Sequence, residues 1–186
     1  MRTDEELMQS FAHGDAAAFA ELFARWAPAL LRVAQRQLGQ RADAEDIVQQ
    51  TFLQLHRARR DFKPSMKLRP WLFTIALNLC RDLQRWRGRR PQVSVDDVVL
   101  AAPVPASSTG EAAELEAKVR SALGRLSAEQ RAVIELHWFE ELPFGEIATI
   151  VGASSGAVRV RAHRGYQALR KMLGGEVGLP SVEEAG

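Results

Sequence analysis

The residues with the most distinctive chemistry in this 186-residue sequence are cations gathered in two segments. Residues 154–173 carry five Lys or Arg and no acid, and residues 57–90 carry eleven against two acids. The segments 1–56 and 113–153 are each acidic, with a formal charge of −3. Because the whole chain has a net charge of only +2, this segregation indicates two separate surfaces that face a polyanion.

Residues that could support catalysis or metal binding are sparse and scattered. The histidines stand far apart, and the sequence has no His-Glu-x-x-His motif, phosphate-binding loop or pair of cysteines. The single cysteine, Cys80, excludes an internal disulfide and a Cys-rich zinc site. The sequence therefore predicts no metal and no cofactor, and it argues against an enzyme.

Residues 142–173 have the pattern of a helix-turn-helix. A short apolar helix over 142–151 is followed by Gly152-Ala153-Ser154, in which Gly152 ends one helix and Ser154 caps the next. In the second helix the inward positions are Val158, Ala162, Gly165, Leu169 and Met172, and the outward ones include Ser155, Arg159, Val160, His163 and Arg164. A helix divided in this way suits the major groove of DNA.

Gly165 has an unfavourable place within that second helix. A glycine in a helix interior lowers helix stability relative to alanine, so we predict that another helix approaches it closely.

The basic segment 57–90 is interleaved with aromatic residues. Phe62, Trp71, Phe73 and Trp86 alternate with the cations, which suits a single nucleic-acid strand: cations for phosphates and rings for unstacked bases. The alternative is an ordinary solvated helix end with the rings in the core, and the residues alone leave both readings open.

The elements that must position these residues are all helices. Local signals for helix starts are a capping box of Thr3 with Glu6, Asp15, Asp43, Pro70, and a second capping box of Ser127 with Gln130. Pro28 is predicted to split the helix that Asp15 caps. For the helix of residues 69–90 we predict an inner stripe of Trp71, Leu72, Ile75, Leu79, Leu83 and Trp86. No segment alternates as a strand does, so the fold class is all-α.

The chain divides by composition into two small helical domains. Residues 91–110 hold three prolines and no helical periodicity, which is typical of a flexible linker. We therefore expect domains at 1–90 and 113–175, a linker at 91–112, and a disordered tail at 176–186. With no signal sequence and no membrane-spanning run, a cytoplasmic protein is expected.

Several longer motifs follow one another along the chain. They are Asp-Ala-Glu-Asp-Ile-Val-Gln-Gln-Thr-Phe-Leu (43–53), Pro-Trp-Leu-Phe-Thr-Ile-Ala-Leu-Asn (70–78), Asp82 and Arg85, Leu-Ser-Ala-Glu-Gln-Arg (126–131), Ile147-Ala148, and Gly-Ala-Val-Arg-Val-Arg (156–161). With these motifs, in this order, the sequence resembles the extracytoplasmic-function sigma factors of bacterial RNA polymerase from about residue 3 to 173. The resemblance implies that 1–90 is sigma region 2 and 113–175 is region 4.

The resemblance also implies roles for particular residues. The 43–56 helix would dock on the clamp helices of the β′ subunit through Asp46, Gln49, Gln50 and Leu53, and the β subunit would be a further polymerase contact. The −10 element would be opened and read by Phe62, Lys63, Lys67, Asn78, Arg81, Arg85 and Arg89. The −35 element would be read by Ser155, Arg159, Val160, His163 and Arg164.

Two of these positions depart from the common family pattern. Gln50 stands where many relatives have Glu, so one polymerase contact is expected to differ. Val160 stands at a position that is often polar, so apolar contact with a thymine methyl group would replace a hydrogen bond there.

The expected partners are core RNA polymerase, promoter DNA and an anti-sigma factor. The resemblance implies that the anti-sigma factor is membrane-linked, while this chain makes no membrane contact of its own. A stand-alone helix-turn-helix regulator is the alternative, but it leaves segment 57–90 without a role. A sigma-mimicking anti-anti-sigma protein would need a receiver domain, for which the length leaves no room.

Overall fold

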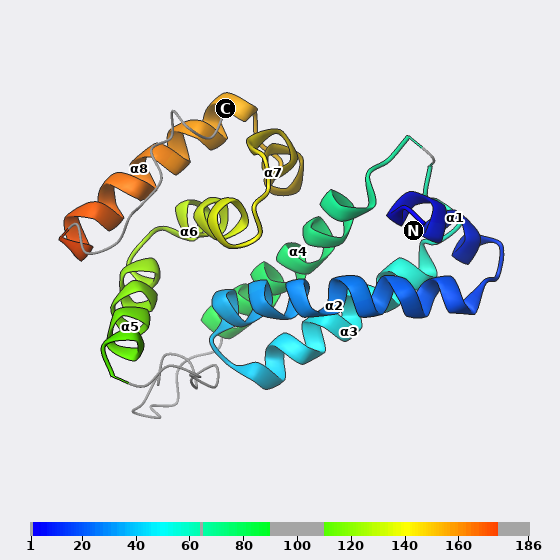
Figure 1. Cartoon of the computed structure of the whole chain (residues 1–186), viewed down its shortest axis with the longest axis horizontal. Helices are drawn as coiled ribbons and strands as arrows, with labels where there is room; N and C mark the ends of the chain where they lie inside the picture. Colours follow the sequence, from blue (N-terminus) through cyan, green and yellow to red (C-terminus); the bar gives the residue numbers. More distant parts are fainter. Residues whose placement is uncertain (1, 64, 90–109, 175–186) are drawn as a thin grey trace. The chain divides into compact units, whose positions relative to one another are not determined.

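The structure is a computed structural model that describes residues 2–63, 65–89 and 110–174. Every regular element in this described part is a helix, which confirms the all-α prediction (Figure 1). The chain forms two compact units, Met1–Ala102 and Pro103–Gly186, and their boundary falls among residues outside the described ranges. Most of the predicted linker and all of the predicted tail also lie outside them.

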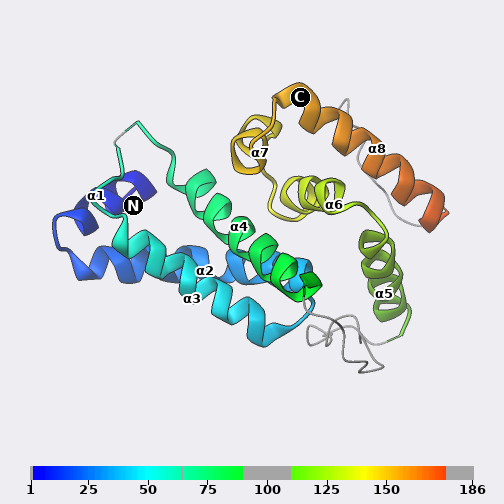
Figure 2. The ribbon, with the colours of Figure 1, turned by 180° about the vertical axis from the view of Figure 1, so that it is seen from behind.

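The N-terminal unit is a bundle built around α2. Its helices are α1 (Asp4–Ala12), α2 (Ala16–Leu38), α3 (Arg41–Arg57) and α4 (Leu68–Arg89). Helix α2 contacts the other three, and α3 also packs along α4, as Figures 1 and 2 show from opposite sides. Leu22, Leu30, Leu55 and Leu72 are completely buried between them.

Three of the predicted helix starts in this unit are confirmed, and one of them is Pro70, which lies in the first turn of α4. Thr3 and Glu6 form the reciprocal capping box, and Asp15 accepts hydrogen bonds from the N–H groups of Ala17 and Ala18 at 2.9 and 3.1 Å. The N–H of Thr3 lowers the pKa of the Glu6 carboxyl, and that of Ala18 lowers the pKa of Asp15. Both caps are therefore carboxylates at neutral pH, which suits the positive end of a helix dipole.

The prediction that Pro28 splits a helix is wrong. Helix α2 continues through it, although proline removes one helical hydrogen bond and costs about 3 kcal/mol in a helix interior. Leu22 and Leu30 on either side are both fully buried, and this packing holds the two halves in one helix.

The prediction that Asp43 caps α3 is wrong. The helix begins at Arg41, with Gln40 before it, and Asp43 lies in the first turn. Its two carboxylate oxygens accept hydrogen bonds from Nη2 of Arg87 at 2.7 and 2.8 Å. Asp43 therefore ties the start of α3 to the far end of α4.

The buried face of α4 also differs from the predicted stripe. The buried residues are Leu68, Pro70, Leu72, Phe73, Ala76, Leu77 and Cys80. Of the predicted stripe only Leu72 is fully buried, and Trp86 is 48% exposed. The inner face is turned toward Phe73 and Leu77 because α4 packs on both α2 and α3.

The C-terminal unit packs around its last helix. It contains α5 (Glu111–Gly124), α6 (Ala128–Ile134), the π-helical segment η1 (Glu135–Phe139), α7 (Phe144–Val151) and α8 (Ser155–Leu173). The predicted capping box of Ser127 and Gln130 is confirmed at the start of α6. The π-helical turn has no counterpart in the sequence-based prediction, and it leads from α6 toward the helix-turn-helix.

The predicted close approach at Gly165 is confirmed. A methyl group added at this glycine would lie 3.1 Å from Cγ1 and 3.3 Å from Cδ1 of Ile134 on α6. Ile134 is completely buried, so it has little room to move. The missing side chain of Gly165 therefore sets how closely α8 lies on α6.

We predict that Gly165→Ala lowers the free energy of unfolding by about 1 kcal/mol, because overpacking against Ile134 outweighs the better helix propensity of alanine. Gly156→Ala in the same helix is the control, since a methyl group there meets nothing within 4 Å. We expect the control to be neutral or slightly stabilised. Urea unfolding followed by circular dichroism measures both, and equal stabilisation of the two variants would contradict the packing role.

Candidate functional site

The first candidate surface is one face of α3. Asp46, Gln49, Gln50 and Leu53 are all exposed and follow one another at helical spacing. They stand opposite the buried face that includes Ile47, Val48 and Leu55. The structure therefore brings the four predicted polymerase-binding residues together on one surface.

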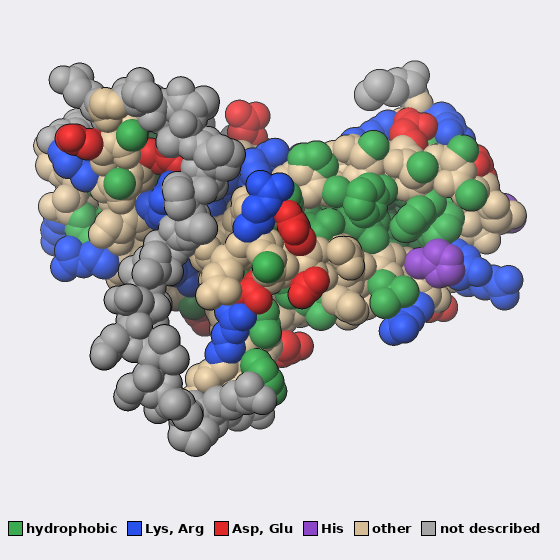
Figure 3. Space-filling model, turned by 90° about the horizontal axis from the view of Figure 1, so that it is seen from below, with side chains coloured by type: hydrophobic (Ala, Val, Ile, Leu, Met, Phe, Trp, Pro, Cys, Tyr) green, Lys and Arg blue, Asp and Glu red, His purple; other side chains and the backbone are tan. Residues whose placement is uncertain are grey.

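An apolar patch from α2 adjoins this face, and the sequence reasoning missed it. Phe23 is 42% exposed, and its ring lies 4.7 Å from that of Phe52, the neighbour of Leu53 in α3. Figure 3 shows hydrophobic side chains gathered on one face of the N-terminal unit. Phe23 is one residue past the fully buried Leu22, which turns it about 100° away from the core, so a helical wheel was the available signal.

The second candidate surface is the 61–67 segment with the outer face of α4. Lys63 and Lys67 are exposed in the segment, and Asn78 and Arg85 are exposed along α4. Arg81 is half-buried and donates to Oδ1 of Asn78 at 3.1 Å. The side chain of Arg89 lies outside what the structure describes.

Phe62 does not offer a free ring to this surface. It is only 9% exposed and stacks on Trp71, with ring centroids 5.6 Å apart. In this conformation the buried ring attaches the 61–67 segment to Trp71 of α4. The aromatic residue exposed near Arg85 is Trp86.

Two arginines of α4 differ in the ion pairs that they form. Arg85 pairs with Asp82 at 3.3 Å, but both side chains are about 70% exposed (70% and 69%), so the pair is weak and exchangeable. Arg87 is held by Asp43, whose side chain is only 17% exposed. Of these two arginines, Arg85 is the more exposed, at 70% against 40% for Arg87.

The third candidate surface is the N-terminal half of α8, which follows a helix-turn-helix. Gly152 ends α7 in the left-handed conformation at φ 66°, and the hydroxyl of Ser154 accepts from Ala157 N–H at 3.2 Å. Both features confirm the predicted turn. The exposed residues of α8 include Arg159, Val160, His163 and Arg164, while Ser155 is half-buried.

The inner face of α8 fixes the orientation of these side chains. Four of the five residues predicted to face inward are buried, namely Val158, Ala162, Gly165 and Leu169, whereas Met172 is half-buried. Tyr166 and Leu173 are also buried, which the predicted stripe did not include. Burial raises the pKa of Tyr166 to about 12, so its phenol stays neutral behind the exposed face.

The cations of α8 also divide into two kinds. Arg161 turns toward the scaffold and pairs with Glu129 of α6 at 3.0 Å. Arg159 and Arg164 point to solvent instead. On the outer face, Nε2 of His163 lies 2.9 Å from Nε2 of Gln167.

The described ranges show no group of three or more His, Cys, Asp or Glu side chains that could hold a metal ion. They also contain no helix with the length and apolar character that a membrane crossing requires.

Comparison with known proteins decides the family. The family model described as Sigma-70 region 2 matches residues 22–90, and that of Sigma-70 region 4 matches residues 116–169. The RNA polymerase sigma factor CarQ of Myxococcus xanthus is 38% identical over 90% of this chain and 95% of its own. The ECF RNA polymerase sigma factor SigM of Mycobacterium tuberculosis is 30% identical over 93% of this chain and 86% of its own. The chain belongs to the extracytoplasmic-function sigma factors. It is thus a transcription initiation factor that directs RNA polymerase to promoters.

Solved structures of sigma factors share the fold. CnrH in complex with the cytosolic domain of CnrY matches with a TM-score of 0.73 and 34% identity, covering 94% of this chain and 99% of that one. RpoE of Bartonella quintana, in complex with the anti-sigma factor NepR, matches with a TM-score of 0.68 and 26% identity, covering 86% and 98%. The helix-turn-helix of α7 and α8 lies mostly within the region 4 match, and α3 and α4 lie within the region 2 match.

Proposed function

We propose that the three surfaces divide the work of this sigma factor among polymerase docking, capture of the −10 strand and reading of the −35 element. The observation that carries the proposal is that in α3 and in α8 the predicted contact residues stand together opposite the buried face. We assign the first two tasks to the domain of residues 1–90 and the third to that of 113–175. No catalytic role falls to this chain, and its place beside the polymerase puts it in the cytoplasm.

The polymerase-docking surface consists of Asp46, Gln49, Gln50 and Leu53, extended by Phe23 of α2. A charged and polar rim around exposed Leu53 and Phe23 is the usual composition of a protein interface. The β′ clamp helices are the partner that the family resemblance implies for this face.

The −10 surface consists of Lys63, Lys67, Asn78, Arg81 and Arg85, with Arg89 at the end of α4. Lys63, Lys67 and Arg85 are exposed cations, and the exposed Asn78 adds a hydrogen-bonding group, as a single strand with splayed bases requires. Because Phe62 is stacked on Trp71, its role toward DNA is to support the segment, and Trp86 is the large aromatic side chain exposed on α4.

The −35 surface consists of Arg159, Val160, His163 and Arg164, with Ser155 at the helix start. Guanidinium groups can read guanine edges in the major groove, and Val160, which is 50% exposed, offers apolar contact to a thymine methyl group.

Tethering lets two modest DNA contacts act together. When both domains sit on one polymerase, each raises the effective concentration of the other, within the reach of the residue 91–112 linker. Recognition then depends on both promoter elements, and strand contacts at −10 offset the cost of melting.

An anti-sigma factor is the proposed inhibitor. The related CnrH and RpoE were solved with CnrY and with the anti-sigma factor NepR, respectively, and we infer a comparable partner for this chain. That the partner is membrane-linked stays a prediction.

The experiment that tests the function adds the purified chain to core RNA polymerase and a pool of random-sequence templates. Transcripts are selected and sequenced over several rounds. We expect defined start sites, each preceded by two sequence elements at fixed spacing, only when the chain is present. A stand-alone DNA-binding regulator would bind DNA but would not confer promoter-specific initiation. The promoter selected here serves the tests below.

We predict that Asp46→Arg weakens binding to core polymerase at least tenfold. A cation then replaces the anion on the docking face, so the expected attraction to the polymerase becomes a repulsion. Glu45→Arg is the matched control, since it makes the same charge change on the same helix about 100° away. Fluorescence anisotropy with labelled core measures both. Equal binding by folded Asp46→Arg and wild type would refute the docking assignment.

We predict that Arg164→Ala weakens binding to the −35 element by about 1–3 kcal/mol and relaxes specificity at one base pair. Arg161→Ala is the control, because Arg161 is paired with Glu129. Holoenzyme binding to −35 elements with every single-base change measures the effect. A uniform loss on all sequences would make Arg164 a phosphate contact instead.

We predict that Lys63→Ala with Arg85→Ala impairs opening of the selected duplex promoter more than binding to a template unpaired at −10. A pre-melted template removes the unstacking cost, so only lost strand contacts remain. Arg87→Ala, which removes a cation held by Asp43, should leave strand binding unchanged. Permanganate footprinting reports opening, and identical defects on both templates would exclude a melting role.

A further inference from the structure

Helix α1 contacts both ends of the segment that carries Lys63 and Lys67. Near its C-terminus, the ring of Phe11 lies 5.5 Å from that of His56 and 5.9 Å beneath the guanidinium of Arg59. Near its N-terminus, Oε1 of Glu5 accepts a hydrogen bond from the backbone N–H of Leu68 at 3.2 Å. The same short helix therefore holds the segment where it leaves α3 and where it enters α4.

The chemistry at the start of α4 explains why an outside acceptor is needed there. The first N–H groups of a helix have no partner within the helix, and a side chain just before the helix usually accepts from them. Lys67 occupies that place, and its ammonium group cannot accept a hydrogen bond. The carboxylate of Glu5 supplies the acceptor from another helix, and its charge suits the positive end of the helix dipole.

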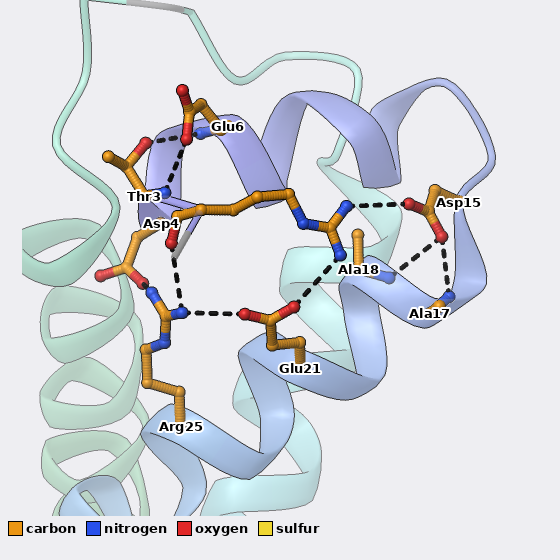
Figure 4. Close-up of polar contacts among 9 residues, drawn as sticks. Thr3, Asp4, Glu6, Asp15, Ala17, Ala18, Glu21 and Arg25 are labelled. Atoms are coloured by element: carbon orange, nitrogen blue, oxygen red, sulfur yellow. Dashed lines mark hydrogen bonds and ion pairs between the residues drawn. The ribbon is translucent and has the colours of Figure 1, made fainter.

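Helix α1 is itself held firmly enough to act as a support. Leu7 and Met8 are completely buried, and Arg25 of α2 pairs with both Asp4 and Glu21. Arg2 adds ion pairs to Asp15 at 3.2 Å and to Glu21 at 3.1 Å, and Figure 4 shows this network around the start of α1. Asp4 thus pairs with Arg25 of α2, while the next residue, Glu5, accepts the hydrogen bond from Leu68 of α4.

We propose that Glu5 is a positioning residue for recognition of the −10 strand. It fixes the N–H of Leu68, and with Phe62 stacked on Trp71 this gives the 61–67 segment a defined entry and exit. Lys63 and Lys67, each close to one of these fixed points, are then presented to DNA at a lower entropy cost. The proposal rests on the proposed −10 function of this segment, and it concerns a helix that precedes the region 2 match, which begins at residue 22.

The test compares three variants of the full-length chain. Glu5→Ala removes the acceptor, Glu5→Gln keeps an acceptor oxygen without the charge, and Gln9→Ala is the control at an exposed position of the same helix. In Glu5→Ala we expect exchange of the Leu68 amide hydrogen to be faster by about tenfold, the factor typical of a lost hydrogen bond to a charged group. Glu5→Gln should restore much of the protection, and Gln9→Ala should match wild type.

The DNA readout uses holoenzyme and a single-stranded oligonucleotide with the selected −10 sequence. Glu5→Ala should weaken strand capture several-fold while binding to core polymerase stays unchanged, with partial rescue in Glu5→Gln. Met8→Ala, which leaves a cavity beneath the same helix, separates positioning from general destabilisation. The positioning role requires that Glu5→Ala lose more strand capture than Met8→Ala at equal or lesser loss of stability.

Three results would overturn the proposal, and they are distinguishable. Unchanged exchange at Leu68 in Glu5→Ala would show that the cap does not exist in solution. Faster exchange with normal strand capture, in a protein where Lys63→Ala reduces capture, would show that the segment reads DNA without this support. Normal capture in both Glu5→Ala and Lys63→Ala would instead refute the proposed −10 function of the segment, and the positioning role with it.

Discussion

Both units depend on one geometric constraint, which is that a helix turns by about 100° per residue, so the side chains it buries decide which ones it exposes. In α3, burial of Ile47, Val48 and Leu55 turns Asp46 and Gln50 outward together. In α8, the contact of Gly165 with Ile134 locks the helix against α6 and leaves Arg159 and Arg164 on the opposite side. In both units, each proposed binding face is therefore the exposed side of a helix whose opposite side lies in the core.

This constraint is also why much of the fold and site could be predicted from the sequence. The capping boxes at Thr3 and Ser127 depend on residues three positions apart, and the turn at Gly152 depends on one residue that tolerates a left-handed backbone. The outward face of α8 followed from its apolar spacing. Each of these features depends on residues within one or two helical turns of one another. Residues that close in the sequence are also close in space, so their spacing predicts their contacts.

The predictions failed where a distant residue decides the outcome. Pro28 remains inside α2 because buried residues on both sides outweigh a local penalty, and Asp43 accepts from Arg87 in another helix instead of capping its own. The spacing of the sequence likewise does not show that Phe62 stacks on Trp71, and the contact of Phe62 with a base stays a prediction. Glu5 and Leu68 are 63 positions apart, so no local pattern connects a carboxylate in α1 with the start of α4.

Ion pairs within the fold also distinguish the two basic segments. A count of charges makes 57–90 the stronger cationic region, but Asp43 already neutralises Arg87, and Asp82 lies against Arg85. The exposed pair of Arg85 with Asp82 is weak enough to be exchanged for other contacts, as the proposed capture of a single strand requires. In α8, Arg161 pairs with Glu129 of α6, and the exposed face carries Arg159 and Arg164 on a helix packed against the core. Such a face suits the groove of a DNA duplex, which has a fixed shape. The proposed division of tasks between the two domains is therefore consistent with the difference between an exposed, exchangeable pair on α4 and a pair with the scaffold on α8.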